Sequence, residues 1–526
     1  MTHSPLIILG GVIIRIIQVV VESSLYVVIG LLTAGAIRAM VKPESLRRVF
    51  GFGRWSGPIR AWVAATTLLP VCSLGVLPVI RELRRARVSR AAILTFALAT
   101  PMLNPISLVY GMSYLGPKVL LVLIGGAFVV SVGVGVALGH LAPEEDFDEA
   151  TPDEVGSVPA KGLLRVMAAG VHAAREATGP SAGNILIGIL GAGVVTSLFT
   201  APYLATSMTT GDPLAIPRMM LVAPLAYVGP DQGIAMVPEM LKFRQSAGAM
   251  FVLVALGVGM SLGHVRWIWR SYGRRIVLTW MGLLLGTTLA VAYAVDGWIP
   301  AVGTANDDND HFAILGNSAE GYRGIDALTQ GLPAYLEKVS TFHWMTTGFL
   351  AALVLAGLAL RAIGERGRFE AFLTTEEPAV EEAETLVGTP IWNRPLPPRF
   401  ASSVGVFCVA GIVMAGSYAY FPSPAEAFRD MQIIKADFYG ELSATSLSAP
   451  LHHLDLWDRQ AGKLSTGAII RLSTPGAEAR RLTSELRQGI QELRIVTQES
   501  RRDEARVLFA KLQTVYDRCK VAYGIH

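Results

Sequence analysis

Charged residues and cysteines are both scarce in this chain. Only 16% of its 526 residues are Asp, Glu, Lys or Arg, against about 25% in soluble proteins. The three cysteines, Cys72, Cys408 and Cys519, lie far apart without a CxxC pair, which excludes a disulfide framework and a zinc knuckle. No Walker motif, catalytic triad or zinc motif occurs, so we expect no enzyme, no ATP-driven pump and no cofactor. The net charge of +4 is too small to indicate a nucleic-acid partner.

Long apolar runs are abundant instead, with 52% hydrophobic residues and a mean hydropathy of +0.46. Crossing a bilayer takes roughly 20 apolar residues. We therefore expect an all-α, multi-pass protein of the cell (inner) membrane that has the lipid bilayer as its surroundings and is compatible with a homo-oligomer. The expected spans are 18–37, 91–112, 119–139, 183–203, 246–263, 276–296, 343–362 and 401–421. The first lies in an apolar run from Pro5, interrupted by Arg15 and Glu22, which is either one long tilted helix or an interfacial helix leading into a span.

Residues 61–80 form a further apolar stretch with a basic loop on each side. Cytoplasmic loops carry an excess of Lys and Arg, so both loops are expected in the cytoplasm, and a full span between them would place one outside. Pro70, Gly75 and Pro78 also interrupt a helix here. The stretch is therefore predicted to be a re-entrant hairpin with its tip at 71–75. The basic residues are Arg38, Lys42, Arg47, Arg48, Arg54 and Arg60 before it, and Arg81, Arg84, Arg85, Arg87 and Arg90 after it.

The sequence repeats itself at an offset of 158 residues. The offset relates 29–35 to 187–193 and the broken stretch 61–80 to 219–238, which carries Gly and Pro in corresponding places. Counting spans from the basic loops makes the two halves inverted and places the C-terminal part outside the cytoplasm. Inverted repeats with paired, interrupted segments are typical of secondary transporters, whose substrate site lies between the broken elements near the membrane midplane.

The tip of the first hairpin carries the first candidate site residues, Cys72, Ser73, Gly75 and Pro78. A thiol suits soft metals or metalloids, whereas a lone cysteine is more often a small buried hydrophobe.

The second and third candidate groups lie in other interrupted segments. In the 91–112 span, prolines leave backbone carbonyls without a helical hydrogen-bond partner. Polar side chains lie beside these carbonyls, and they either line a pathway or form a structural kink. The tip of 219–238 carries Asp231, which is either a proton or ion site or a solvated turn residue. Gln232 follows Asp231 at this tip. The candidate residues in the 91–112 span are Thr100, Pro101, Asn104 and Pro105.

The stretch 61–117, with its CSxG-V-x-P turn, basic connector and TPxxNP motif, resembles the predicted permease family that includes the organoarsenical efflux permeases. The likeness includes Glu22 ahead of Tyr26 and is weaker in the second half. It implies a permease architecture. The family usually has Cys-Ser-Cys-Gly at the hairpin, but Leu74 stands at the second cysteine here, which weakens the case for a dithiol metalloid site.

The C-terminal region has a different character, with many charges and helical periodicity. Breaks near 448–450 and 473–476 separate about four helices, so we expect a soluble helical bundle. His452 and His453 with Asp455 offer metal ligands, but adjacent histidines point to different helix faces, which favours a solvated or capping role. The expected organisation is a first repeat (1–140), an acidic cytoplasmic loop (141–182), a second repeat (183–298), loops and two more spans (299–421) and the extracytoplasmic bundle (422–526).

The sequence therefore predicts a secondary transporter that exports a small solute or a metal or metalloid species, coupled to protons if Asp231 titrates. The alternative is a membrane-anchored sensor or scaffold whose bundle is the functional module. Convergence of Cys72 and Asp231 on one site would favour the transporter.

Overall fold

A computed structural model describes most of the chain. The described residues are 5–41, 43–51, 53–141, 164–196, 204, 207–242, 245–299, 326–362, 410–411, 414, 416–418, 420–442 and 448–525. Within these ranges the secondary structure is helical, apart from an isolated antiparallel bridge between Thr209 and Gln245. The expected span 401–421 and Cys408 fall largely or wholly outside the described residues.

The helices before the undescribed stretch 142–163 are α1 (Pro5–Met40), α2 (Pro43–Phe50), α3 (Ser56–Leu68), α4 (Val76–Arg85), α5 (Arg90–Met102), α6 (Pro105–Tyr114) and α7 (Gly116–Leu141). The next group contains α8 (Leu164–Ala177), α9 (Pro180–Thr196), α11 (Ala215–Val222), η2 (Ala223–Leu225), α12 (Pro230–Lys242), α13 (Ala247–Val252), η3 (Leu253–Val258) and α14 (Leu262–Trp298). Then follow η5 (Ala327–Gly331), α15 (Leu332–Lys338), α16 (Thr341–Ala362), α19 (Pro424–Glu441), α20 (Ser448–Ile470), α21 (Ala477–Gln498) and α22 (Arg502–Ala522).

Five helices in the described part are long and apolar enough to cross a membrane, which identifies an integral membrane protein. They are Ile8–Met40, Arg90–Met112, Pro117–Leu141, Leu262–Trp298 and Thr341–Ala362, and the bent pair Val166–Ala177 with Pro180–Val194 makes a sixth if it counts as one span. The first apolar run is one continuous helix, α1. At 1.5 Å per residue its 36 residues extend about 54 Å, so it tilts or projects beyond a ~30 Å hydrocarbon core.

The first interrupted stretch turns back on itself. Both its ends lie at the start of α5: a Cβ on Gly57 would lie 3.3 Å from Ser89 Oγ and 3.6 Å from Ala92 Cβ. Its turn lies at the other end of α5, where Asn104 Nδ2 donates to the Val71 carbonyl over 3.5 Å. This is the arrangement of a hairpin about as deep as α5 is long, roughly 20 Å. Its depth in a bilayer stays a prediction.

The second interrupted stretch is built in the same way. Ser246 N donates to Met208 O over 2.9 Å, which joins the two ends of the segment at the start of α13. At the turn, Val228 N donates to Gly257 O over 3.0 Å, where the helix α13–η3 ends. These contacts parallel those of the first hairpin, and the repeat itself stays a prediction.

Two expected boundaries differ from the structure. The 246–263 stretch is covered by α13 and the π-helical η3, and a break at Ser261 precedes the 37-residue α14, which Gly273 interrupts with a φ of 82°. The expected acidic loop 141–182 contains α8, a helix packed against α1 and α16. The apolar pattern did not predict α8, because Arg175 and His172 interrupt the apolar run by which a membrane span is recognised.

The basic connector after the first hairpin is part of a charged network. Arg81 donates to both carboxylate oxygens of Glu176 on α8 over 2.9 and 2.7 Å, and Arg85 pairs with Glu82 over 2.6 Å. Arg84 lies over the Tyr272 ring, with Cζ 5.1 Å from its centroid. Several of the positive charges that set the predicted orientation are thus partnered within the protein.

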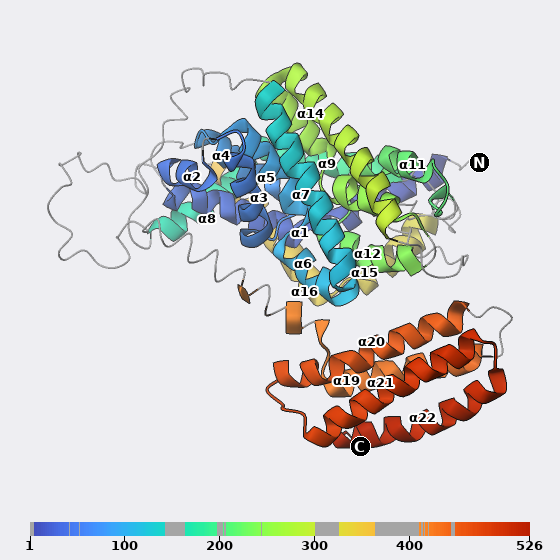
Figure 1. Cartoon of the computed structure of the whole chain (residues 1–526). Coiled ribbons are helices and arrows are strands. Elements are labelled where there is room, and N and C mark those ends of the chain that lie inside the picture. Colours follow the sequence, from blue (N-terminus) through green and yellow to red (C-terminus); the bar gives the residue numbers. More distant parts are fainter. Residues whose placement is uncertain are drawn as a thin grey trace, which may run out of the picture.

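The helices α19–α22 pack side by side around a hydrophobic cluster of their own (Figure 1). Trp457 and Phe438 are fully buried there, and Tyr516 Oη donates to Phe428 O over 2.7 Å. Their cluster is separate from the one formed by the hydrophobic helices of residues 46–299. That this group is soluble and extracytoplasmic stays a prediction.

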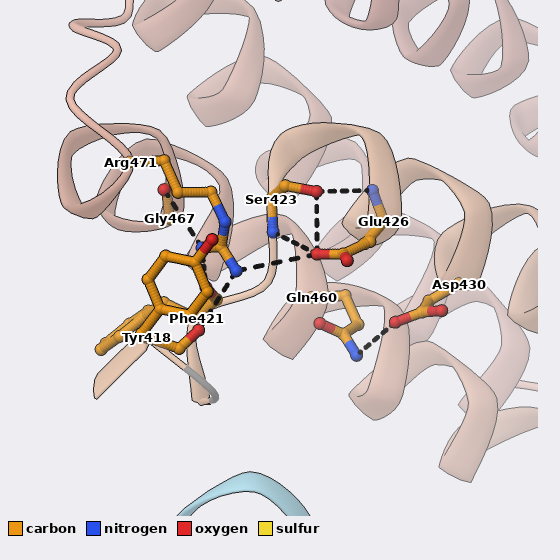
Figure 2. Close-up of polar contacts among 8 residues, drawn as sticks. All are labelled: Tyr418, Phe421, Ser423, Glu426, Asp430, Gln460, Gly467 and Arg471. Atoms are coloured by element: carbon orange, nitrogen blue, oxygen red, sulfur yellow. Dashed lines mark hydrogen bonds and ion pairs between the residues drawn. The ribbon is translucent and has the colours of Figure 1, made fainter. Parts of the chain in front are cut away.

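Polar contacts hold the segment that precedes α19 in place (Figure 2). Ser423 and Glu426 form a capping box at the helix start. Arg471, at the end of α20, donates to the carbonyls of Tyr418 and Phe421, and its Cζ lies 4.1 Å from the centroid of the Tyr418 ring. The segment that leads into the four helices is therefore held against the end of α20.

Candidate functional site

The turn of the first hairpin is buried against α1. Cys72, Ser73 and Leu74 have no exposed surface, and Cys72 Sγ accepts a hydrogen bond from Gly75 N over 3.4 Å. A Cβ on Gly30 would lie 1.9 Å from the Gly75 carbonyl oxygen, so only glycine at position 30 permits this approach. Pro78 is buried in the first turn of α4, where a missing backbone N–H is tolerated.

The break between α5 and α6 follows from the TPxxNP motif. Pro101 cannot donate a helical hydrogen bond, and Thr100 Oγ1 donates back to Phe96 O over 2.7 Å. Asn104 is fully buried and caps α6 by accepting from Ser107 N over 2.8 Å, with Pro105 in the first turn. Asn104 thus serves the freed backbone, and its amide also reaches the hairpin turn.

The turn of the second hairpin also contacts α1. Asp231 is in the first turn of α12, and its Oδ1 accepts from Tyr26 Oη of α1 over 2.9 Å. Gln232 Oε1 accepts from Gly229 N over 3.2 Å, and Ser107 Oγ of α6 donates to Pro230 O over 3.3 Å. Asp231 is therefore attached to α1 rather than left as a free turn residue.

Two charged residues of α1 complete the site. Arg15 is 1% exposed and donates to the Tyr227 carbonyl over 2.8 Å. Its Nη1 lies 3.8 Å from Glu22 Oε2. The Glu22 carboxylate lies beside the Gln232 side chain and within electrostatic range of Asp231. Arg15 and Glu22 are two helical turns apart on one face of α1. This spacing is a sequence signal that could have identified them as a pair, although both lie far from every other motif in the sequence.

Predicted site residues from both hairpins meet at two tyrosines. Tyr26 lies near both the Asp231 carboxylate and the Cys72 sulfur, and Tyr227 lies near Cys72 and Glu22. Cys72, Leu74, Tyr26 and Tyr227 also share one hydrophobic cluster. We name this group the polar cluster; its members are Arg15, Glu22, Tyr26, Cys72, Tyr227, Asp231 and Gln232.

The polar cluster has unused hydrogen-bonding capacity. Within the described residues, Arg15 Nε and Glu22 Oε2 are buried without a hydrogen-bond partner, as is Oγ of the neighbouring Ser73. Such groups are costly inside a protein unless something satisfies them. Among the described residues no set of three or more His, Cys, Asp or Glu side chains is placed to hold a metal ion.

Comparisons with known proteins agree with the helical architecture. A family model described as "Predicted permease" matches residues 9–297. The UPF0718 protein YcgR of Bacillus subtilis is 25% identical over 293 residues, which cover 53% of this chain and 95% of the relative. A Streptococcus mutans protein, named as a candidate subunit of a two-component membrane permease complex, is 23% identical over 136 residues, which cover 26% of this chain and 45% of that protein. No solved structure matches the chain.

Proposed function

Because the chain belongs to this family of predicted permeases, we propose that it is a secondary transporter of the cell membrane that exports a small solute or a metal or metalloid species. The observation that carries the proposal is the meeting of both hairpin turns and α1 at the polar cluster. Charged groups inside a membrane are expensive and are typical of substrate and ion pathways. A site between two interrupted elements is also where alternating access places the transported solute.

Asp231 is the proposed coupling group, with a proton as the coupling ion. Its contact with Tyr26 joins the second hairpin to α1. A proton on the carboxylate would remove the negative charge that holds this contact, so loading and release of the proton would favour different arrangements of hairpin and helix.

Cys72 is the proposed contact for a soft substrate. One thiol at the hairpin turn, with Leu74 at the position of the family's second cysteine, supplies a single soft ligand. In this arrangement the sulfur is buried and held by Gly75 N, so substrate would reach it only after the hairpin moves away from α1.

The alternative of a sensor or scaffold rests on the separate four-helix group, which has its own core. A scaffold has no need for Cys72 and Asp231 to approach the same tyrosines, so their proximity favours the transporter. We further propose the five segments of the sequence-based organisation as domains, with residues 422–526 outside the cytoplasm.

A resistance and uptake screen tests the proposal. A deletion strain carrying the wild-type chain is compared with one carrying Asp231→Asn across arsenicals, metal ions and small organic solutes. We expect at least one compound to accumulate in the deletion strain and in the Asp231→Asn strain, and to be exported by wild type. Identical profiles for deletion and wild-type strains across the whole panel would contradict the transport proposal.

A further inference from the structure

Three arginines are exposed where α2 leads into α3: Arg48 near the end of α2, Arg54 in the turn and Arg60 in α3. Arg60 Nη1 donates to the Arg48 carbonyl over 3.2 Å. A Cβ on Gly51, in the turn, would lie 3.1 Å from the same nitrogen. The long Arg60 side chain therefore reaches back to the turn, which brings its charge to the same corner of the protein as the other two. We call Arg48, Arg54 and Arg60 the corner arginines.

The corner arginines carry more positive charge than the described residues around them balance. The acidic residue of α2, Glu44, accepts a hydrogen bond from Arg47 over 3.2 Å. Within the described residues, no carboxylate forms an ion pair with Arg48, Arg54 or Arg60. Guanidinium groups bind phosphate well, because their N–H donors match two phosphate oxygens at once. The corner therefore favours an anion that carries a phosphate.

An apolar surface begins at the same corner. Trp55, Ile59 and Val63 are 63%, 40% and 48% exposed, and their spacing of four residues places them on one face of α3. Another face of α3 packs against α5 and α7, with the rings of Trp62 and Phe128 edge to face at 5.1 Å between centroids. The exposed face, which we call the apolar stripe, therefore points away from the helical body.

The length of the apolar stripe matches the depth of one membrane leaflet. Val63 follows Trp55 by eight positions, which is about 12 Å at 1.5 Å per residue, and half of the hydrocarbon core is about 15 Å deep. Tryptophan is enriched where headgroups meet hydrocarbon, and Trp55 lies at the basic end of the stripe. Basic segments at the cytoplasmic surface, where we expect this loop, attract anionic lipids. Positive charge at one end and an apolar face beyond it complement an anionic phospholipid.

We propose that this corner binds one anionic phospholipid, such as phosphatidylglycerol, with its phosphate on the corner arginines and an acyl chain along the apolar stripe. The site goes beyond the proposed function, because it needs no transported solute. The acidic stretch 144–154 is the other candidate occupant, since it follows α7, whose His140 ring lies 6.2 Å from that of Trp55. Phe147 is the one large apolar residue of that stretch. The stretch would match the arginines but leave most of the stripe uncovered, whereas a phospholipid matches both.

Native mass spectrometry of the purified full-length protein measures the affinity for the first bound lipid. We expect wild type to bind phosphatidylglycerol more tightly than phosphatidylcholine of the same chain length. Arg48→Gln/Arg54→Gln should bind phosphatidylglycerol about 30-fold more weakly, because each arginine contributes a factor of about 5, and should bind phosphatidylcholine like wild type. Arg60 is kept, because it bonds the turn. Arg429→Gln/Arg481→Gln, at exposed positions on α19 and α21, is the control and should match wild type. Equal phosphatidylglycerol affinities for wild type and the corner variant would overturn the proposal.

Two further variants separate the lipid from the other occupants. Trp55→Ser/Val63→Gln keeps the arginines and should weaken phosphatidylglycerol binding by a factor on the order of 10; unchanged binding would refute a chain on the stripe. Glu144→Gln/Glu145→Gln/Asp146→Asn should bind the lipid like wild type. Binding by this variant but not by wild type would overturn the proposal by assigning the corner to the acidic stretch. Displacement of the lipid by an equal concentration of inorganic phosphate would also overturn it, by showing a site for free phosphate.

Discussion

At the scale of single residues, the sulfur of Cys72 is both a packed atom and the one soft ligand of the polar cluster. It is fully buried, and Gly75 N donates to it. Because the thiol lies at the turn shared with α1, we propose that it meets the substrate when the hairpin moves.

Cys72→Ala should therefore abolish protection against a trivalent arsenical, while the amount of protein in the membrane stays unchanged. Cys519→Ala, which removes a buried thiol from the four-helix cluster, is the matched control and should protect like wild type. Growth curves with immunoblots of membrane fractions measure both quantities. Normal protection by Cys72→Ala would leave the thiol with a packing role only.

Residue patterns predicted the hairpin side of the site better than the α1 side. Asp231 and Cys72 stand out because polar groups at Pro- and Gly-interrupted positions are unusual within apolar runs. Arg15 and Glu22 are visible as charges, but their partner Tyr227 is 212 positions from Arg15. An apolar helix has no polar face to show which side meets its neighbours, so periodicity did not link these residues.

At the scale of helices and hairpins, glycine decides how closely α1 and the first hairpin approach. The Gly30 position faces the Gly75 backbone, which cannot move aside as a flexible side chain would. Small residues allow this kind of backbone contact between membrane helices.

Gly30→Ala should destabilise the protein by about 1–3 kcal/mol, the usual range for overpacking. Gly125→Ala on α7 is the control, because nothing lies within 4 Å of its Cβ position. Thermal unfolding of both variants in detergent measures the difference. Equal melting temperatures for Gly30→Ala and wild type would show that α1 and the hairpin turn do not touch.

The interrupted segments were predictable because proline and glycine break helices in any environment. The helix α8 was not predictable, since its charged residues interrupt its apolar face. The division of 246–263 was not predictable either, since that stretch breaks at a serine. The predicted side of the membrane for each loop depends on positively charged residues. Some of these, such as Arg81 and Arg85, form ion pairs with carboxylates within the protein.

Labelling with a membrane-impermeant thiol reagent tests that topology in a chain whose native cysteines are replaced. Ser45→Cys and Arg87→Cys, exposed positions on either side of the first hairpin, should both be protected in intact cells and react after permeabilisation. Thr341→Cys, at the exposed start of α16, should react from outside. Reaction of only one of the two loop positions from outside would make 61–80 a full span.

At the scale of the whole molecule, the chain combines a helical membrane body with a four-helix group that has its own core. Apolar run length and composition predicted this division. The packing of α16 against α1 could not be predicted, because it depends on a contact between residues 322 positions apart in the chain.

Gradient-driven transport by Asp231→Asn tests the central claim, that the polar cluster couples solute movement to protons. Asparagine keeps the size of the side chain but cannot carry the charge. In proteoliposomes with a solute found by the screen, we expect this variant to exchange solute across the membrane and to lose accumulation driven by a pH gradient. Asp212→Asn, which alters an ion pair with Arg218 outside the cluster, should accumulate solute like wild type. Full pH-driven accumulation by Asp231→Asn would contradict the account.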